Sequence, residues 1–183
     1  MRAFIGIPIS EDLKGKILKI QEKFREFDIK FVEKGNLHFN LKFLDEIPEE
    51  KTTEIKSSLG NLSQLFETFE INIRGMGVFP NENYIRVVWI GVKKGYQQML
   101  ALAEVIENAL VDLGIEREAK KFEPHLTLGR VRSARNKKEL AETVERYKDL
   151  EIGTMKVDRL VLFESVLTRQ GPIYKEVFSI TLK

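Results

Sequence analysis

The only two histidines of the chain occur in the same short pattern, as His38-Phe39-Asn40-Leu41 and His125-Leu126-Thr127-Leu128. Residues i and i+2 of a β-strand share a face, so each imidazole is expected beside a hydrogen-bonding side chain, Asn40 or Thr127. A neutral imidazole can take a proton from an attacking water or hydroxyl, and an imidazolium can protonate the leaving oxygen. Asn40 and Thr127 can donate to the phosphate oxygens on which charge grows. The pattern therefore predicts acid–base catalysis at phosphorus by His38 and His125.

A metal site competes poorly with this interpretation. The chain has no cysteine. Two histidines on separate strands, without a nearby carboxylate motif, lack the usual spacing of metal ligands. The absence of cysteine also excludes thiolate catalysis and iron–sulfur clusters. We therefore expect neither a metal nor another cofactor.

Two cationic side chains near the histidines are candidates for contacts with RNA. Lys42 has the strand parity of His38 and is expected on the same face. Arg130 has the opposite parity from His125, so it can reach the site only if the strand bends or ends near Gly129. Gly129 itself shares the face of His125, where a missing side chain can let a substrate approach closely.

Aromatic and basic residues elsewhere suggest a nucleic-acid partner. Phe79 beside Pro80, and Tyr174 after Gly171-Pro172, lie in loop-like contexts where they can stack on bases or pack in the core. The stretch Pro124–Lys138 holds five basic residues and no acidic one, as contact with a phosphate backbone requires, although a solvated loop has the same composition.

The histidine patterns belong to a longer internal repeat. Phe4-Ile5-Gly6-Ile7 recurs as Trp89-Ile90-Gly91-Val92 at an offset of 85 residues, and the histidines recur at an offset of 87. Between them, two series of apolar residues with identical spacing each mark one face of a helix: Leu13, Ile17, Ile20, Phe24 and Phe27, then Met99, Ala103, Ile106, Leu110 and Leu113. We therefore predict two related strand–helix–strand units. A pseudo-twofold axis between them would let the imidazoles face each other across a groove.

The other segments mix helix and strand. A helix is expected to begin at Pro48, and another to span Asn136–Leu150. Strands are expected over Phe69–Val78, Lys156–Leu167 and Tyr174–Leu182. Because no Ser/Gly-rich linker divides the chain, we expect one compact bilobal domain of residues 1–183. Its lobes would be roughly 1–80 and 81–183, with terminal strands free to exchange between them.

Composition excludes several classes of protein. The chain has 183 residues, of which 43% are hydrophobic and 32% charged, so it is neither disordered nor of low complexity. No apolar run approaches the roughly 20 residues of a membrane span, and Met1 leads directly into a strand-like segment. We expect a cytoplasmic monomer without a membrane partner. Many Lys and Glu residues with no Cys fit a thermophile, such as a thermophilic archaeon.

The motif residues and their surroundings resemble the two-histidine (2H) phosphoesterase superfamily, which has two H-x-T/S-x motifs. Within it, the likeness is to the 2′-5′ RNA ligase family, also called RNA 2′,3′-cyclic phosphodiesterase. It extends over nearly the whole chain, through Arg2-Ala3-Phe4-Ile5, Asn36-Leu37-His38 to Lys42-Phe43-Leu44, Gly77-Val78-Phe79-Pro80, Pro124-His125 to Val131, and Gly171-Pro172-Ile173-Tyr174.

The resemblance implies an α+β fold in which duplicated, pseudo-twofold units place two mainly antiparallel sheets around a central groove. It implies hydrolysis of RNA 2′,3′-cyclic phosphate ends to 2′-phosphates, and reversible 2′-5′ joining of RNA such as tRNA halves. His38 would be the proton donor, His125 the proton acceptor and Thr127 a phosphate ligand. The residues alone leave open which histidine is acid and which is base.

Two residues depart from the family pattern. Asn40 stands where the family has Thr or Ser, and Asp45 where Gly is common. An amide can donate to phosphate but is longer than a hydroxyl. Two alternatives therefore remain open: a catalytically weakened protein that binds RNA ends, or a phosphodiesterase for small cyclic phosphates or 2′-5′ oligonucleotides.

Overall fold

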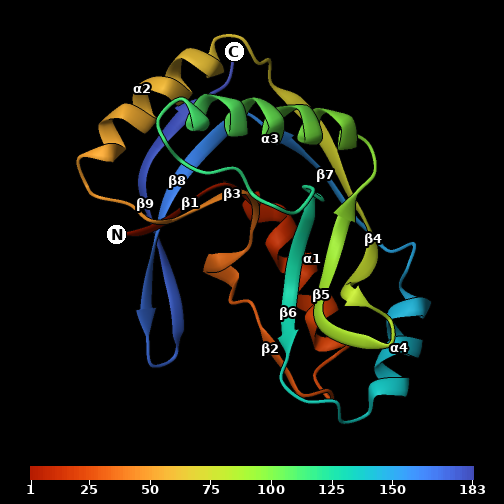
Figure 1. The fold of residues 1–183 in the computed structure, drawn as a ribbon. Coiled ribbons are helices and arrows are strands. Elements are labelled where there is room, and N and C mark those ends of the chain that lie inside the picture. The colour runs from red at the N-terminus through yellow and green to blue at the C-terminus, as the bar shows by residue number, and fades with distance from the viewer.

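The alternating and apolar runs of the sequence form nine β-strands, and its amphipathic segments form four α-helices (Figure 1). The computed structural model describes all residues from 1 to 183. The strands are β1 (Arg2–Pro8), β2 (Ile29–Phe31), β3 (His38–Glu46), β4 (Phe69–Asn81), β5 (Tyr84–Val92), β6 (His125–Val131), β7 (Glu151–Val157), β8 (Arg159–Thr168) and β9 (Gly171–Thr181). The helices are α1 (Glu11–Glu22), α2 (Lys51–Ser63), α3 (Tyr96–Val111) and α4 (Lys137–Arg146), with a 3-10 turn, η1, at Lys34–Asn36.

All strands lie in one antiparallel sheet whose centre is formed by the two histidine strands. The strand order is β7-β4-β5-β6-β3-β1-β8-β9, and the short β2 pairs with β6. β3 and β6 pair directly only at Phe39 and Leu126. The two sheets expected from the sequence are therefore the two halves of one sheet, which this narrow contact joins.

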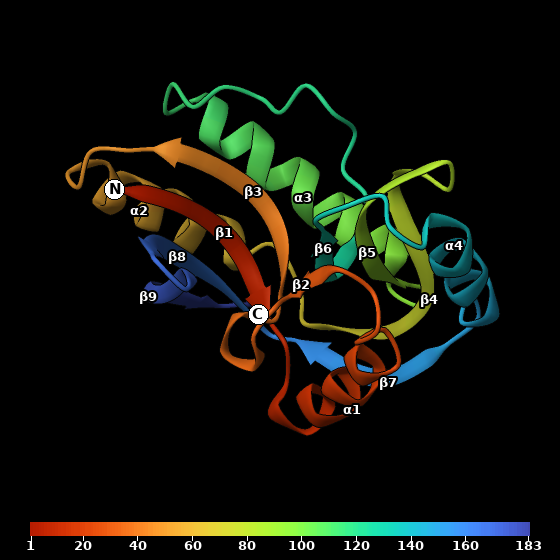
Figure 2. The same ribbon diagram turned by 90° about the horizontal axis from the view of Figure 1, so that it is seen from below.

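The internal repeat is visible in the topology. β1 lies between β3 and β8, and β5 lies between β6 and β4, so the repeated strands occupy equivalent places in the two halves. Each repeated helix crosses to the other half, since α1 packs against β7 and α3 packs against β3 (Figure 2). Residue 80 falls inside the β4–β5 pairing, and β8 and β9 return to β1. The two halves are thus interleaved along the chain.

The first helix is shorter than its apolar spacing predicts. α1 ends at Glu22, and the backbone continues in tighter turns in which Phe24 N donates to Gln21 O at 2.9 Å and Phe27 N donates to Phe24 O at 3.0 Å. Both phenylalanines are still buried. The spacing therefore identified the core face correctly but not the point at which i→i−4 bonding stops.

The strand expected over Lys156–Leu167 is two strands. β7 ends at Val157 and β8 begins at Arg159, with Asp158 between them. The division arises because β7 pairs with β4 in one half of the sheet, whereas β8 pairs with β1 in the other half. A continuous apolar pattern does not reveal such a crossing.

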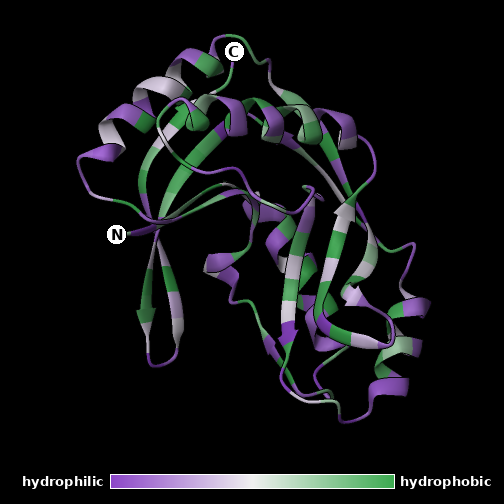
Figure 3. Cartoon of the chain, viewed as in Figure 1, coloured by the Kyte–Doolittle hydropathy of each residue, from purple (hydrophilic) through white to green (hydrophobic).

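The hydrophobic core lies between the sheet and the helices, and apolar residues gather along the strands (Figure 3). Phe39 and Leu126 are fully buried in it. Strand alternation turns the histidines to the opposite face, where they are only half-buried. None of the helices combines the length and apolar character needed to cross a membrane.

Candidate active site

The pairing of β3 with β6 assembles the four motif side chains. Because Phe39 is opposite Leu126 in an antiparallel pair, the register sets His38 beside Thr127 and Asn40 beside His125. All four side chains line one cleft of about 280 Å³, the histidine cleft. The i, i+2 spacing thus identified which side chains share a face, and the tertiary pairing brings the two sets together.

Both imidazoles are held in the same way by a backbone carbonyl two residues earlier. His38 Nδ1 lies 2.6 Å from Asn36 O, and His125 Nδ1 lies 2.7 Å from Glu123 O. A carbonyl oxygen only accepts hydrogen bonds, so Nδ1 carries the proton and Nε2 is the atom that exchanges protons with a ligand. The sequence gives no signal for these two carbonyls, because any residue type supplies one.

The two supporting segments are themselves anchored. Asn36 Nδ2 donates to Pro172 O at 2.8 Å, which ties η1 to β9. The Tyr96 hydroxyl donates to Glu123 Oε2 at 2.9 Å, which ties the segment before β6 to α3. Each imidazole orientation therefore depends on an element far away in the sequence.

Aromatic rings surround the imidazole of His38. Its ring centroid lies 4.7 Å from that of Phe4 and 5.1 Å from that of Tyr174, which meets it edge-on. Burial lowers the pKa of His38 to about 4, although the hydrogen bond to Asn36 opposes the shift and the proximity of His125 adds to it. His38 is therefore neutral at pH 7.

The second imidazole, that of His125, is also flanked by aromatic rings, but a nearby cation changes its electrostatic environment. Phe79 meets His125 edge-on at 4.9 Å between centroids, and Trp89, the repeat partner of Phe4, lies at 6.3 Å. Burial lowers the pKa of His125, the hydrogen bond to Glu123 raises it, and the charge of Arg130 lowers it. Phe79 and Tyr174, expected as stacking residues, thus each contact one imidazole.

Two β-bulges at equivalent positions of the repeat place Lys42 and Arg130 on the strand faces opposite to those predicted. On β3, Asn40 pairs with Gly6 but Lys42 pairs with Ile5, which leaves Leu41 as an extra residue. On β6, Thr127 pairs with Trp89 but Gly129 pairs with Val88, which leaves Leu128 as the extra residue. An extra residue moves every later side chain to the other face.

The first bulge turns Lys42 away from the histidine cleft, contrary to the expectation that this residue contacts RNA. Lys42 is 1% exposed, and its Nζ donates to Glu116 O at 2.6 Å and lies 3.1 Å from Glu107 Oε1. Phe43 takes its place on the cleft face and is 52% exposed. Lys42 therefore forms a structural ion pair with Glu107 of α3.

The second bulge has the opposite effect on Arg130, which lines the histidine cleft with His125 and Thr127. Gly129 does not leave room for a substrate. A Cβ on Gly129 would clash with Ile29 Cγ2 and lie 2.9 Å from Lys30 O. The missing side chain instead allows β2 to pack against β6.

Two helix residues at equivalent positions of the repeat hold the bulges. Gln21 of α1 is buried, and its Nε2 donates to Leu128 O at 3.0 Å and to Val32 O at 2.8 Å. Its counterpart in α3 is Glu107, which pairs with Lys42 at the other bulge. Each helix therefore supports the histidine strand that belongs to the other repeat unit.

A second hollow, the basic groove, opens beside the histidine cleft. Its volume is about 650 Å³, and it shares Asn40, Phe43, His125, Thr127 and Arg130 with the cleft. The residues that it adds include Phe79, Arg86, Lys120, Lys121 and Phe122. Arg86 and the Lys120-Lys121 pair were not predicted from the sequence, although that pair lies only four residues before His125.

Asn40 offers a free hydrogen-bond donor to the site. Its Nδ2 is buried and has no partner in the structure. A buried donor without an acceptor is costly and points to an acceptor supplied by a ligand. Together with Thr127 and Arg130, it can bind the oxygens of an anionic group placed between two imidazoles.

Acid should destabilise the protein through His38. The unfolded chain binds this proton near pH 6.5 and the folded protein only near pH 4, so the free energy of unfolding falls as the pH drops between these values. The expected loss from pH 7 to pH 4.5 is about 2.5 kcal/mol. Urea unfolding of the wild type and His38→Gln at both pH values measures it. Equal losses in the two proteins would contradict the lowered pKa, and His125→Gln should change the loss in the same direction as His38→Gln.

Comparisons with known proteins identify the family of this chain. Residues 11–168 match a family described as the 2′-5′ RNA ligase superfamily. A Methanocaldococcus jannaschii protein named RNA 2′,3′-cyclic phosphodiesterase is 41% identical over 177 residues, which cover 97% of this chain and 98% of that protein. A protein of the same name from Methanothermobacter thermautotrophicus is 39% identical over 179 residues, with coverage of 97% and 96%.

Solved structures confirm the mixed α+β fold. The crystal structure of a Thermus thermophilus protein has a TM-score of 0.85 at 28% identity and covers 100% of this chain and 98% of its own. Escherichia coli LigT, in a complex with 3′-AMP, has a TM-score of 0.80 at 21% identity, with coverage of 99% and 97%.

Proposed function

The chain belongs to the 2′-5′ RNA ligase superfamily, and we propose that it hydrolyses RNA 2′,3′-cyclic phosphate ends to 2′-phosphates without a metal. The observation that carries this proposal is the matched pair of imidazoles in one cleft, each held at Nδ1 by a carbonyl. Such a pair leaves two Nε2 atoms to move protons at one phosphate. The names of the relatives support the same substrate.

The reaction needs one proton acceptor and one proton donor. Water attacks the phosphorus and loses a proton to His125, the P–O3′ bond breaks, and O3′ takes a proton from His38. The products are a 2′-phosphate and a free 3′-hydroxyl. Thr127, Asn40 and Arg130 would bind the non-bridging oxygens as charge grows on them.

The low pKa of His38 couples protonation to substrate binding. Burial lowers the pKa of His38 to about 4, so the donor is almost wholly neutral at pH 7. The negative charge of a bound cyclic phosphate raises the pKa of an adjacent imidazole. The substrate itself would therefore bring the proton donor into its active form.

The same cleft can support ligation. If a 5′-hydroxyl of a second RNA replaces water as the nucleophile, the P–O3′ bond breaks in the same way and a 2′-5′ phosphodiester forms. The basic groove and the histidine cleft meet at His125, which gives two RNA ends separate approaches to one phosphate. tRNA halves are one class of substrate with such ends.

The proposal is tested by the fate of a short labelled RNA that ends in a 2′,3′-cyclic phosphate, incubated with the protein in EDTA. We expect a 2′-phosphate end. Tight binding without product would instead favour a protein that binds RNA ends, and activity only after added zinc or magnesium would refute the metal-free mechanism.

Replacement of Asn40 tests its role as a phosphate donor. Asn40→Asp replaces the free N–H donor by a carboxylate, so kcat/KM for a cyclic phosphate should fall by about 10- to 100-fold, which matches a lost hydrogen bond to a charged group. Asn40→Thr, which supplies a hydroxyl donor, is the matched control and should keep or raise the rate. If Asn40→Asp is as active as the wild type, Asn40 does not contact phosphate.

A further inference from the structure

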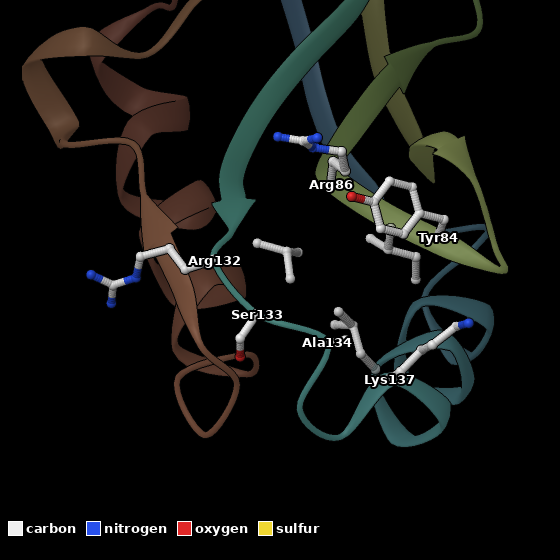
Figure 4. Close-up of a pocket in the computed structure, with 9 residues that line it drawn as sticks. Tyr84, Arg86, Arg132, Ser133, Ala134 and Lys137 are labelled. Atoms are coloured by element: carbon white, nitrogen blue, oxygen red, sulfur yellow. The ribbon is translucent and has the colours of Figure 1, made fainter.

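A third hollow, the hairpin pocket, lies beyond the basic groove between the end of the β4–β5 hairpin and the start of α4 (Figure 4). Its volume is about 260 Å³. Arg86 and Val131 line both the hairpin pocket and the basic groove, so the two hollows share a wall. Because the groove also contains His125 and Arg130, one continuous surface runs from the imidazoles to this pocket.

The length of β6 sets the distance along this surface. His125 begins the strand and Val131 ends it, so the seven residues span about 20 Å at roughly 3.3 Å per residue. A single RNA strand with its terminal phosphate in the histidine cleft would reach the hairpin pocket after a few nucleotides.

The lining of the pocket has the chemistry of a nucleotide site. No acidic residue lines the pocket, and Arg86, Arg132 and Lys137 are its basic residues. Arg132 pairs with Asp28, whereas Arg86 and Lys137 form no ion pair in the structure. Tyr84 is 57% exposed, and the Arg86 guanidinium lies 5.8 Å from its ring centroid. Aromatic rings beside unpaired cations bind single-stranded nucleic acid through base stacking and phosphate contacts.

The structure divides the basic stretch Pro124–Lys138 into parts with different roles. Arg130 lines the histidine cleft. The side chain of Arg132 points away from the other labelled residues in Figure 4, and its Nε lies 3.1 Å from Asp28 Oδ1, which neutralises its charge. Lys137 lines the hairpin pocket, whereas the adjacent Lys138 is exposed and lines no part of it.

We propose that the hairpin pocket binds one nucleotide of the RNA substrate a few positions from the cyclic phosphate, with the base against Tyr84 and its two flanking phosphates at Arg86 and at Lys137. This inference rests on the proposed function and deepens it. The pocket makes an oligonucleotide end, and not a cyclic mononucleotide, the preferred substrate class.

The test compares kcat/KM for an eight-nucleotide RNA ending in a 2′,3′-cyclic phosphate with kcat/KM for adenosine 2′,3′-cyclic phosphate. The wild type should favour the long substrate at least tenfold. Tyr84→Ala and Lys137→Ala should each lower this ratio about fivefold or more, as expected for the loss of one stacked base or phosphate contact. Lys138→Ala is the matched control and should lower it less than twofold, and Lys137→Arg should retain it.

Two results would overturn the proposal. A wild-type ratio near one means that the distant nucleotides make no productive contact. Equal effects of Lys137→Ala and Lys138→Ala mean that a diffuse positive field, and not the pocket, attracts the RNA.

Binding separates this inference from the proposed function. The affinity of an eight-nucleotide RNA with a 2′-phosphate end is measured by fluorescence anisotropy in the same variants. If no substrate turns over but Tyr84→Ala and Lys137→Ala still weaken binding more than Lys138→Ala, the pocket is an RNA site and the catalytic proposal fails. Displacement of the RNA by poly-glutamate at equal charge concentration would show a site for any polyanion and refute the nucleotide assignment.

Discussion

Replacing His125 with Ala should lower kcat for an RNA 2′,3′-cyclic phosphate by about 10²- to 10⁴-fold, and replacing His38 with Ala should have an effect of the same size. Each variant removes one of the two proton transfers that the reaction needs. The double variant should be little worse than either single variant, because donor and acceptor act in the same step. Single-turnover kinetics on a labelled RNA end measures all three.

The chain offers a clean background for this experiment. It has only two histidines, so each single variant leaves one imidazole whose titration can be followed without overlap. Lys19→Ala, at an exposed position on α1, is the control for effects of expressing and purifying a variant protein. If both histidine variants keep full activity and their thermal unfolding matches the wild type, the two-imidazole mechanism is wrong.

A cyclic phosphate substrate in which sulfur replaces the 3′-bridging oxygen should restore most of the rate that His38→Ala loses. It should restore little of the rate that His125→Ala loses. A thiol has a pKa near 8.5 and leaves as the thiolate without a proton donor, whereas an alkoxide needs one. The recovery should therefore amount to most of the roughly 10²- to 10⁴-fold loss. The measurement is the rate with the sulfur-containing substrate divided by the rate with the normal oxygen substrate, in the wild type and in each variant.

This experiment decides which imidazole is donor and which is acceptor. Rescue of His125→Ala alone would reverse the assignment. Rescue of both variants, or of neither, would contradict a mechanism with one dedicated donor and one dedicated acceptor. The wild-type ratio corrects for the intrinsic difference in reactivity between the two substrates.

The repeat makes the two imidazoles geometrically equivalent, and their neighbours make them chemically different. The equivalent bulges bring Phe43 to the cleft on the His38 side and Arg130 on the His125 side. Arg130 thus puts a fixed positive charge beside His125, and Arg2 lines the same cleft. His38 is enclosed by aromatic rings, and burial lowers its pKa to about 4, so the proposed mechanism requires the charge of the substrate to favour its protonation.

Crossed helices couple the two halves of the site. Gln21 of the first repeat unit supports the bulge next to His125, and Glu107 of the second supports the bulge next to His38. Neither repeat unit can therefore form a complete histidine strand with its own helix. The two repeat units thus form one cleft with shared supports.

Local periodicity was sufficient to group the candidate catalytic side chains on one face of each strand. The repeated His-x-Asn and His-x-Thr spacing predicted that each imidazole shares a face with a donor, and the structure places all four side chains in one cleft. The repeat of strand, helix and histidine strand also predicted the mixed fold, since backbone geometry imposes periods of 2 and 3.6 residues on any chain. These features depend on neighbouring residues alone.

Contacts between segments far apart in the sequence determined the positions of Lys42 and Arg130, the environment of Gly129 and the pKa values of the histidines. An unpaired Leu41 or Leu128 is defined only by the partner strand, so the burial of Lys42 and the placement of Arg130 in the cleft could not be derived from parity. The environment of Gly129 depends on β2, which lies nearly a hundred residues earlier in the chain. The lowered pKa values of both histidines arise from desolvation by side chains of several strands, and desolvation exists only once those strands have packed.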